Sequence, residues 1–198
     1  MDQKISKPPA PGLILMGLKH SGKTTLGKLL AGGNRLFLDL DDLILKVYRE
    51  LPGDEGFPPP SGSPTVRDIY RRSGELFRRC ETLAAREAAE IMEGRPAVLA
   101  LGGGTIENSQ AMLALEKNPG SGEVLFIYLE TDEASLFKRI KAEGIPPFLN
   151  SQNPEKSFSA LYRRRAALCG KKADLTINLS GLSLEQSFKA LLQSLGEF

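Results

Sequence analysis

Apolar and polar positions divide the chain into two kinds of segment. Short apolar runs occur at residues 13–16, 35–40, 97–101, 124–129 and 175–179. Between them lie stretches whose apolar residues recur with helical spacing, at about residues 23–31, 41–50, 132–142 and 157–169. This alternation is typical of a parallel sheet covered by helices on both faces. The pattern predicts an α/β protein with a three-layer α/β/α architecture and a five-stranded parallel sheet.

Local signals predict where several helices begin. Three residues carry hydroxyl groups suited to capping the start of a helix: Thr65, Thr131 and Ser183. The pair Ser73-Gly74 predicts a break in the long helical region that follows Thr65. Beyond this break, five residues share helical spacing and are expected to face the core: Phe77, Cys80, Ala84, Ala88 and Ile91.

Two segments have compositions that do not predict regular structure. Residues 51–64 are rich in proline and glycine, which is typical of an exposed loop or insertion. Residues 1–12 are polar and then rich in proline, and we expect them to form a disordered leader. The remaining residues, 13–198, are expected to form a single domain, since this length suits one hydrophobic core.

Composition argues against several classes of protein. The chain has 26 basic and 24 acidic residues among 198, a balance that argues against a surface built for nucleic acid. No apolar run approaches the length of a membrane span, and the two cysteines, Cys80 and Cys169, have no metal-type spacing. We therefore expect a soluble, cytoplasmic monomer that binds neither nucleic acid nor a membrane.

The strongest motif follows the first apolar run. Gly17-Leu18-Lys19-His20-Ser21-Gly22-Lys23-Thr24 matches the phosphate-binding pattern G-x-x-x-x-G-K-[ST], and it stands between an expected strand and an expected helix. Its backbone N–H groups and the helix N-terminus attract phosphate, Lys23 reaches the β- and γ-phosphates, and Thr24 is a ligand for Mg²⁺. His20, the only histidine, occupies a variable position, which favours an exposed residue without a catalytic role.

Two acidic residues end the second expected strand. Ligands of open parallel sheets bind beyond the carboxyl ends of the strands, so Asp39 and Asp41 are expected near the phosphate loop. One carboxylate could serve Mg²⁺ and the other a substrate hydroxyl. Helix capping by Asp41 and Asp42 explains the same residues equally well.

Gly102-Gly103-Gly104 ends the third expected strand, where many phosphate-loop ATPases carry an aspartate that holds Mg²⁺. Three glycines allow the backbone N–H groups to approach a small anionic or hydroxylated ligand. A simple turn is the alternative interpretation.

Two arginine-containing segments are candidates for binding a substrate carboxylate. Arg78 and Glu81 are three residues apart and would meet on one face of a helix, where the carboxylate could orient the guanidinium. A solvated surface pair is the usual outcome of this spacing. The run Arg163-Arg164-Arg165 follows a proline-containing loop and is either a solvated face or part of the site.

In this order, these segments resemble the shikimate kinase family. The resemblance rests on Gly17–Thr24, Asp39–Asp41, Gly74-Glu75-Leu76-Phe77-Arg78-Arg79-Cys80-Glu81, Gly102–Gly104 and Arg165-Ala166-Ala167-Leu168, and it spans about residues 13–178. It implies a nucleoside monophosphate kinase-like fold and transfer of the ATP γ-phosphate to the 3-hydroxyl of shikimate. It also implies a substrate-binding region at about residues 41–94 and a lid at about residues 143–156.

The resemblance assigns a role to each motif residue. ATP contacts are expected from Gly17, Ser21, Gly22, Lys23, Thr24, Thr25 and Arg139, with Arg139 packed on the adenine. Shikimate contacts are expected from Asp41, Arg78, Glu81, Gly102, Gly103, Gly104 and Arg165. Lys23 and Asp41 are the expected catalytic residues, Thr24 and Asp39 the expected Mg²⁺ ligands, and Glu81 the residue that orients Arg78.

The chain departs from the family pattern at the lid. Pro146 stands where the family has an arginine that closes over the phosphates, and Cys169 replaces a family tyrosine. Lys141, Arg163 and Arg164 are candidates to supply the missing charge. Two alternatives to a shikimate kinase stay open, the first of them favoured by Pro146. One is a shikimate kinase-like protein that binds ligands without turnover, and the other is a different small-molecule kinase of the same fold, such as a gluconate kinase.

Overall fold

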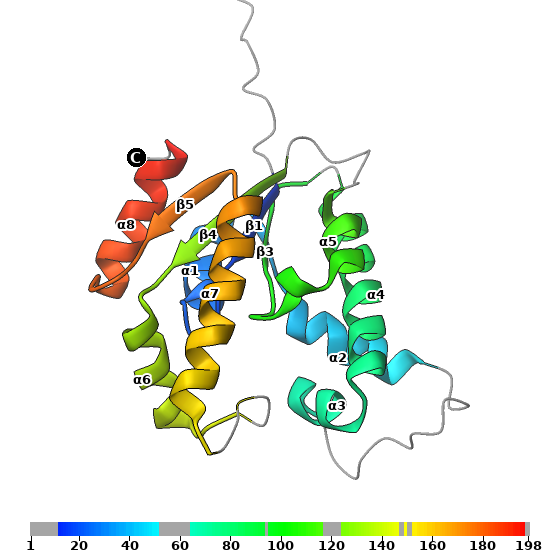
Figure 1. Ribbon diagram of the computed structural model, residues 1–198. Helices are drawn as coiled ribbons and strands as arrows, with labels where there is room; N and C mark the ends of the chain where they lie inside the picture. The colour runs from blue at the N-terminus through cyan, green and yellow to red at the C-terminus, as the bar shows by residue number, and fades with distance from the viewer. Residues whose placement is uncertain are drawn as a thin grey trace, which may run out of the picture.

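The computed structural model describes residues 12–51, 64–93, 95–116, 124–146, 149 and 152–196. Its centre is a parallel sheet with the strand order β2-β3-β1-β4-β5 (Figure 1). The strands are β1 Gly12–Met16, β2 Leu36–Asp39, β3 Ala97–Ala100, β4 Val124–Glu130 and β5 Leu175–Asn178. β1 pairs with β3 on one side and β4 on the other, so the chain changes direction across the sheet at β1. Ligands bind at such switch points, beyond the carboxyl ends of the strands.

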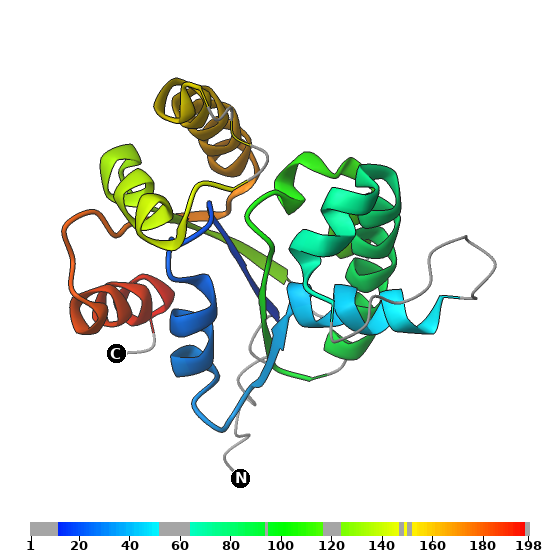
Figure 2. The same ribbon diagram turned by 90° about the horizontal axis from the view of Figure 1, so that it is seen from below.

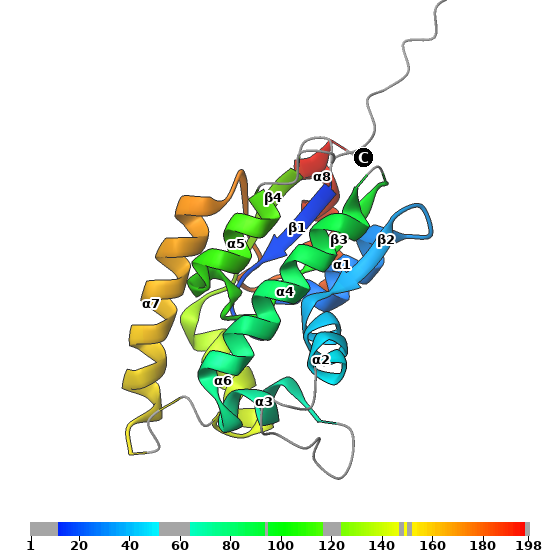
Figure 3. The same cartoon turned by 90° about the vertical axis from the view of Figure 1, so that its right-hand side faces the viewer.

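Helices cover both faces of this sheet (Figures 2 and 3). They are α1 Lys23–Ala31, α2 Leu40–Glu50, α3 Val66–Arg72, α4 Gly74–Met92, α5 Ser109–Glu116, α6 Glu133–Glu143, α7 Pro154–Lys172 and α8 Leu184–Leu195. A short 3-10 helix, η2 Thr105–Glu107, precedes α5. Within the described part of the chain, no helix has the length and apolar content to cross a membrane.

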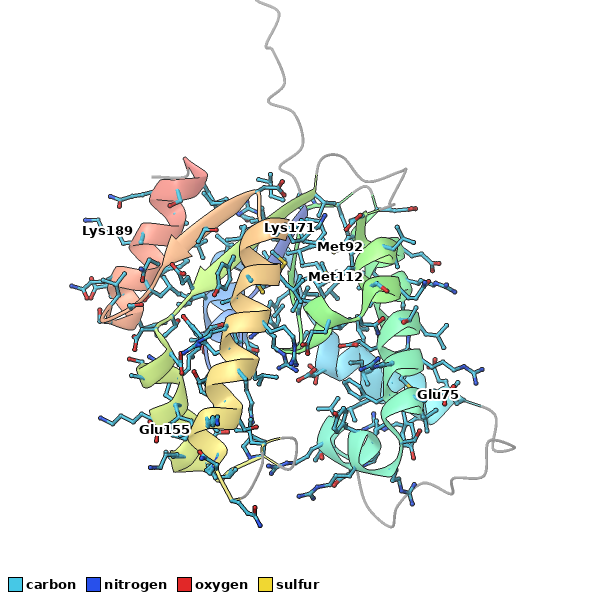
Figure 4. The ribbon with its side chains drawn as sticks, in the orientation of Figure 1. Glu75, Met92, Met112, Glu155, Lys171 and Lys189 are labelled. Carbon is cyan, nitrogen blue, oxygen red and sulfur yellow. The ribbon has the colours of Figure 1, made fainter. Side chains whose placement is uncertain are left out.

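Alternate residues of the strands divide the core into two layers. Leu13 and Leu15 of β1 pack with α1 and α8, whereas Ile14 and Met16 pack with α2, α4, α5 and the buried Cys169 of α7. This division follows from the alternation of side chains along a strand, and both faces are apolar because both are covered. Met92 on α4 and Met112 on α5, labelled in Figure 4, belong to the second layer.

A third apolar cluster lies between the loop after β1 and the helices α6 and α7. It joins Leu18 of the loop after β1 to the helices on either side of the expected lid, and its other buried members are Leu136, Ile140, Leu149 and Phe158. The aromatic rings of Phe137 and Phe158 stack at 5.4 Å within it. Leu18 of the phosphate loop and Leu149 of the lid region therefore belong to the same apolar cluster.

The predicted α/β/α architecture is confirmed, and each expected strand lies within one residue of its observed bounds. Thr65 and Ser183 form capping boxes, and Ser73 separates α3 from α4, as expected. Residues 1–11 of the expected leader and residues 52–63 of the expected insertion lie outside the described residues.

Three expectations about the helices are wrong. The N-cap of α6 is Asp132, whose carboxylate accepts from the Ser135 N–H at 2.8 Å, and not Thr131. The basic helix α7 extends beyond the expected 157–169 at both ends, because Asn153 caps it and Pro154 begins it. On α4 the buried position near the C-terminus belongs to Met92, while Ile91 is only partly buried.

Candidate active site

Residues 17–22 connect β1 to α1 and form the expected phosphate loop. Gly22 caps α1 in the left-handed conformation, with φ of 92°, which glycine adopts without strain. The side chain of Lys23 folds back over the loop, so that its Nζ donates to the Leu18 carbonyl oxygen at 2.8 Å. Burial lowers the pKa of Lys23 to about 8, although the Asp41 and Asp39 carboxylates act in the opposite direction. The loop therefore holds a buried cation at the motif position that contacts phosphate in phosphate-loop proteins.

Asp39 connects the phosphate loop to the second strand. Its Oδ2 accepts a hydrogen bond from the Thr24 hydroxyl at 2.9 Å, and its Oδ1 accepts from the Asp41 N–H at 3.1 Å as the N-cap of α2. Helix capping thus falls to Asp39, and not to Asp41 or Asp42 as the alternative interpretation expected. A threonine hydroxyl and a carboxylate oxygen are the hard ligands that Mg²⁺ prefers, so this pair fits the ion.

Among the described residues, no group of three or more His, Cys, Asp or Glu side chains could hold a metal. A Mg²⁺ ion that binds together with a nucleotide takes one or two protein ligands and keeps water and phosphate oxygens for the rest. Thr24 and Asp39 are therefore the residues of the phosphate-loop region that suit the ion.

Asp41 lies in the first turn of α2, and burial raises the pKa of its carboxyl to about 6, with the neighbouring Asp39 carboxylate adding to the effect. Lys23 opposes this shift. At neutral pH the carboxylate is mostly ionised and more basic than an exposed aspartate. Such a group suits the removal of a proton from a hydroxyl.

Gly102, Gly103 and Gly104 each touch a different part of the site. A Cβ on Gly102 would lie 3.1 Å from the Asp41 Oδ1, and one on Gly104 would lie 2.9 Å from the Arg165 Nη2. A Cβ on Gly103 would lie 2.7 Å from the Lys19 backbone nitrogen, inside the phosphate loop. The segment after β3 therefore brings the acid, the phosphate loop and the late arginine together. The simple-turn interpretation does not explain these three close approaches.

Arg165 of α7 is held from two directions. Its Nη1 donates to the Gly103 carbonyl oxygen at 3.0 Å, and its Nε donates to the Glu107 Oε2 at 2.8 Å. The same Glu107 carboxylate accepts from the Nε of Arg164 through its Oε1 at 2.5 Å. One acid of η2 thus joins two successive arginines of α7 next to the glycine segment.

Glu81 has partners other than the expected one. Its buried carboxylate accepts from the Thr105 hydroxyl at 2.7 Å and from the Asn108 side-chain amide at 2.9 Å. Burial raises the pKa of Glu81, while these hydrogen bonds and the charges of Arg165 and Arg78 act against the rise. Glu81 and Arg78 form no ion pair within the described residues, and Arg78 is exposed on α4. The expected direct orientation of Arg78 by Glu81 is therefore not what the geometry provides.

The tip of the phosphate loop is attached to α6. Arg139 Nη1 donates to the His20 carbonyl oxygen at 2.6 Å, and Glu143 pairs with both the His20 Nδ1 at 3.4 Å and the Lys19 Nζ at 3.3 Å. The expectation of an exposed His20 is wrong, because only 15% of its side chain is exposed. Burial lowers the pKa of His20 despite the opposing charge of Glu143. Arg139 lies where the loop and α6 meet, and its packing on adenine stays a prediction.

Comparisons with known proteins agree with this arrangement. The family model for shikimate kinase matches residues 61–196. The chain is 32% identical to the shikimate kinase of Thermobifida fusca, over 93% of this chain and 95% of the relative. The chain belongs to the shikimate kinase family. A second relative, the shikimate kinase of Bartonella henselae, is 30% identical over 89% of this chain and 74% of its own.

A solved structure of a shikimate kinase has the same fold as this chain. The shikimate kinase from Acinetobacter baumannii, solved in complex with shikimate, has a TM-score of 0.70 and 29% sequence identity, and the match covers 94% of this chain and 93% of the other. Membership of the shikimate kinase family makes this protein an ATP-dependent small-molecule kinase with a phosphate-loop kinase fold.

The structure describes part of the lid region, in which the sequence predicts a departure from the shikimate kinase pattern. Pro146, in the position of the family arginine, is buried, and the carbonyl oxygen of the preceding Ile145 accepts from Arg67 Nη2 of α3 at 3.4 Å. Among the candidates for the missing charge, Lys141 lies over the Phe137 ring and Arg164 pairs with Glu107. Arg163 is exposed. Residues 147–148 and 150–151 of the expected lid lie outside the described residues.

Four residues that contact the candidate site residues were not predicted from the sequence: Thr105, Glu107, Asn108 and Glu143. Glu107 and Asn108 follow the glycine segment closely, and their polar character there was the available signal. Their partners lie on α4 and α7, far away in the sequence, so no local spacing connects them. Glu143 ends α6 and resembles any solvated helix-end acid until the fold brings it to Lys19 and His20.

Proposed function

We propose that the protein transfers the γ-phosphate of ATP to the 3-hydroxyl of shikimate. The observation that carries this proposal is the contact of the glycine segment with Asp41, Lys19 and Arg165, which joins an acid, a phosphate loop and an arginine within one site. Membership of the shikimate kinase family supplies the choice of reaction.

The phosphate loop binds the donor. Backbone N–H groups from Gly17 to Thr25 and the N-terminus of α1 surround the phosphates, and the Lys23 ammonium moves from the Leu18 carbonyl to the β- and γ-phosphate oxygens. Thr24 and Asp39 hold Mg²⁺, which neutralises phosphate charge when bound. Burial makes each of these charges count for more than it would in water.

The acceptor lies between Asp41, Arg78 and Arg165. The two arginines bind the carboxylate and the ring hydroxyls of shikimate, and the glycine segment offers its backbone to the same ligand. Asp41 accepts a hydrogen bond from the 3-hydroxyl and takes its proton as the phosphoryl group arrives. A carboxyl with a pKa of about 6 is ionised at neutral pH and basic enough to contribute. Alignment and charge neutralisation supply most of the catalysis in phosphoryl transfer.

A coupled assay of ADP release tests the proposal. We expect release that depends on both ATP and shikimate, and that falls by at least about 10²-fold in Asp41→Asn, the scale of losing a general base. Arg78→Ala should raise KM for shikimate more than KM for ATP. Asp42→Asn and Arg86→Ala, at exposed positions on the same two helices, are the matched controls and should retain activity.

Two other outcomes would replace this proposal. Activity with gluconate that exceeds activity with shikimate would identify a different acceptor on the same fold. Calorimetric binding of both ATP and shikimate without turnover at high enzyme concentration would identify a binding protein. The buried Pro146 in place of the lid arginine is the observation that favours the second outcome, because a related arginine is worth about 10³–10⁵ in rate in other phosphoryl-transfer enzymes.

A further inference from the structure

Glu107 has the contacts of a residue that controls Arg165. It ends η2, three residues beyond the glycine segment, and its side chain is 23% exposed. Its Oε2 lies 2.8 Å from both the Nε and the Nη2 of Arg165, and its Oε1 accepts from Arg164. Glu107 Oε2 on one edge of the guanidinium and the Gly103 carbonyl oxygen on Nη1 together restrict the position and the plane of that group.

A carboxylate partner suits Arg165 because this cation is mostly buried. The Arg165 side chain is 15% exposed and rests against Gly104. Its charge also reaches Lys23: burial is the main cause of the lowered pKa of Lys23, and the charge of Arg165 lowers that pKa further. Arg164, the preceding residue, is 59% exposed and reaches the other oxygen of the Glu107 carboxylate. Glu107 therefore contacts both arginines.

Glu107 also stays charged in this position. Burial opposes its ionisation, but the hydrogen bonds and charges of Arg164 and Arg165 hold its pKa below the ordinary value. Its carboxylate is therefore an anion throughout the neutral range. Glutamine at this position would offer one carbonyl oxygen and an N–H₂ group, and the N–H₂ group cannot accept from an arginine.

We propose that Glu107 is a positioning residue for the acceptor, which holds the Arg165 guanidinium against the Gly103 carbonyl in the orientation that receives shikimate. This inference rests on the proposed function. Glu107 acts through Arg165 and does not itself contact the substrate. Arg164 shares the carboxylate and fastens η2 to α7, so its removal should have a smaller effect than the removal of Glu107.

Steady-state kinetics of Glu107→Gln test this role. Losing a hydrogen bond to a charged group is worth a factor of about 10 to 100, so KM for shikimate should rise by about tenfold or more. KM for ATP should stay unchanged, because among the described residues no hydrogen bond or ion pair joins Glu107 to the phosphate loop. The matched control is Glu116→Gln, which removes the acid of the Glu116–Lys172 pair at 2.9 Å between α5 and the same helix α7. It should change neither constant.

A double-mutant cycle separates positioning from general support of the fold. If Glu107 acts through Arg165, Glu107→Gln should raise KM for shikimate in the wild type and add nothing in an Arg165→Ala background. Equal effects in both backgrounds, or a rise of both KM values together, would overturn the inference and leave the proposed function intact.

Crystal structures of the ligand-free wild type and Glu107→Gln provide a readout that does not depend on turnover. The Arg165 guanidinium should leave the Gly103 carbonyl in the variant. An Arg165 that keeps its wild-type position would refute the positioning role whatever the activity. Absence of shikimate-dependent ADP release in the wild type would instead refute the proposed function, and the Arg165 position would still decide the role of Glu107.

Discussion

The two halves of the site are built in different ways. The donor half is Gly17–Thr24 with Asp39, and its main internal bond is local, from the Lys23 Nζ to a carbonyl five residues away. The tip of the loop has distant partners, in α6. The proposed acceptor half consists of Asp41, Arg78, Gly102–Gly104 and Arg165, with Glu107 as the residue that holds Arg165. There the bonds of Arg165 join residues 58 and 62 positions apart. One half depends on local backbone conformation, and the other depends on the packing of α7 against η2.

The two halves differ in their sensitivity to structural changes elsewhere in the fold. The N–H groups of the donor half come from one continuous loop, so changes elsewhere in the fold reach them mainly through the contacts of its tip with α6 and Gly103. The acceptor half loses its geometry when any one of several distant segments shifts. We therefore expect damage to one half to leave ligand binding by the other half measurable.

The largest effect is expected in the donor half. Lys23→Ala removes the buried ammonium and should lower kcat/KM for ATP by about 10³-fold or more, the scale of losing a charge that neutralises a transferring phosphoryl group. Calorimetric binding of shikimate should be retained. Lys28→Ala, an exposed lysine of the same helix, is the control. Loss of shikimate binding in Lys23→Ala would show that the two halves are not separable.

The next effect concerns the free energy of unfolding and the acceptor half. The folded state raises the pKa of Asp41 from 3.8 to about 6, so this group favours folding below pH 4 and loses that contribution as the pH rises through 6. Asp41→Asn should therefore stabilise the ligand-free protein at pH 7.5 by up to about 3 kcal/mol, from two pKa units of about 1.4 kcal/mol each. Urea unfolding at pH 7.5 and pH 4 measures this gain, which should vanish at the lower pH. An Asn variant less stable than the wild type at pH 7.5 would contradict the assigned burial cost.

The pH dependence of the rate should contain one limb from each half. Asp41 must be ionised and Lys23 protonated, so kcat/KM for ATP should fall by about tenfold per pH unit below pH 6 and above pH 8. Bound phosphates favour the charged form of Lys23, so the profile of kcat should lose its alkaline limb. A flat profile of kcat/KM between pH 5 and 9 would argue against both assignments.

The smallest effect distinguishes two glycines. Gly104→Ala brings a methyl group to 2.9 Å from the Arg165 guanidinium, and KM for shikimate should rise severalfold as the arginine shifts. Gly170→Ala, in α7 with open space around it, should leave kinetics unchanged and stabilise the protein by roughly 0.5–1 kcal/mol. Thermal unfolding and the coupled assay together separate these results. Equal kinetics for the two variants would mean that Arg165 accommodates the methyl group without consequence.

The fold could be predicted from the sequence because its elements carry local signals. Strands buried on both faces form continuous apolar runs, and capping residues such as Thr65 and Ser183 mark helix starts. The error at α6 arose where two capping residues are adjacent. β4 continues to Glu130, which pairs with Asn178 of β5, and this pairing moves the helix start past Thr131. A partner strand decides such a boundary, and no local pattern contains it.

Some residues of the candidate site could likewise be predicted from the sequence, and others depend on distant partners. The donor half could be predicted from one contiguous motif, and Asp41 and Arg165 from a family resemblance. Glu107 and the burial of His20 could not, because their partners come from α7 and from the far end of α6. The pairing expected for Arg78 and Glu81 was wrong because helical spacing permits a contact without requiring it. Glu81 found nearer donors in Thr105 and Asn108.

Asp39 assigns its two carboxylate oxygens to separate tasks, one to the backbone of α2 and one to the Thr24 hydroxyl. A cation that binds beside Thr24 competes for only the second oxygen. In the proposed mechanism we therefore expect the first turn of α2, which carries Asp41, to keep its cap while nucleotide binds and leaves. The change at Asp39 would then be limited to its hydrogen bond with the Thr24 hydroxyl.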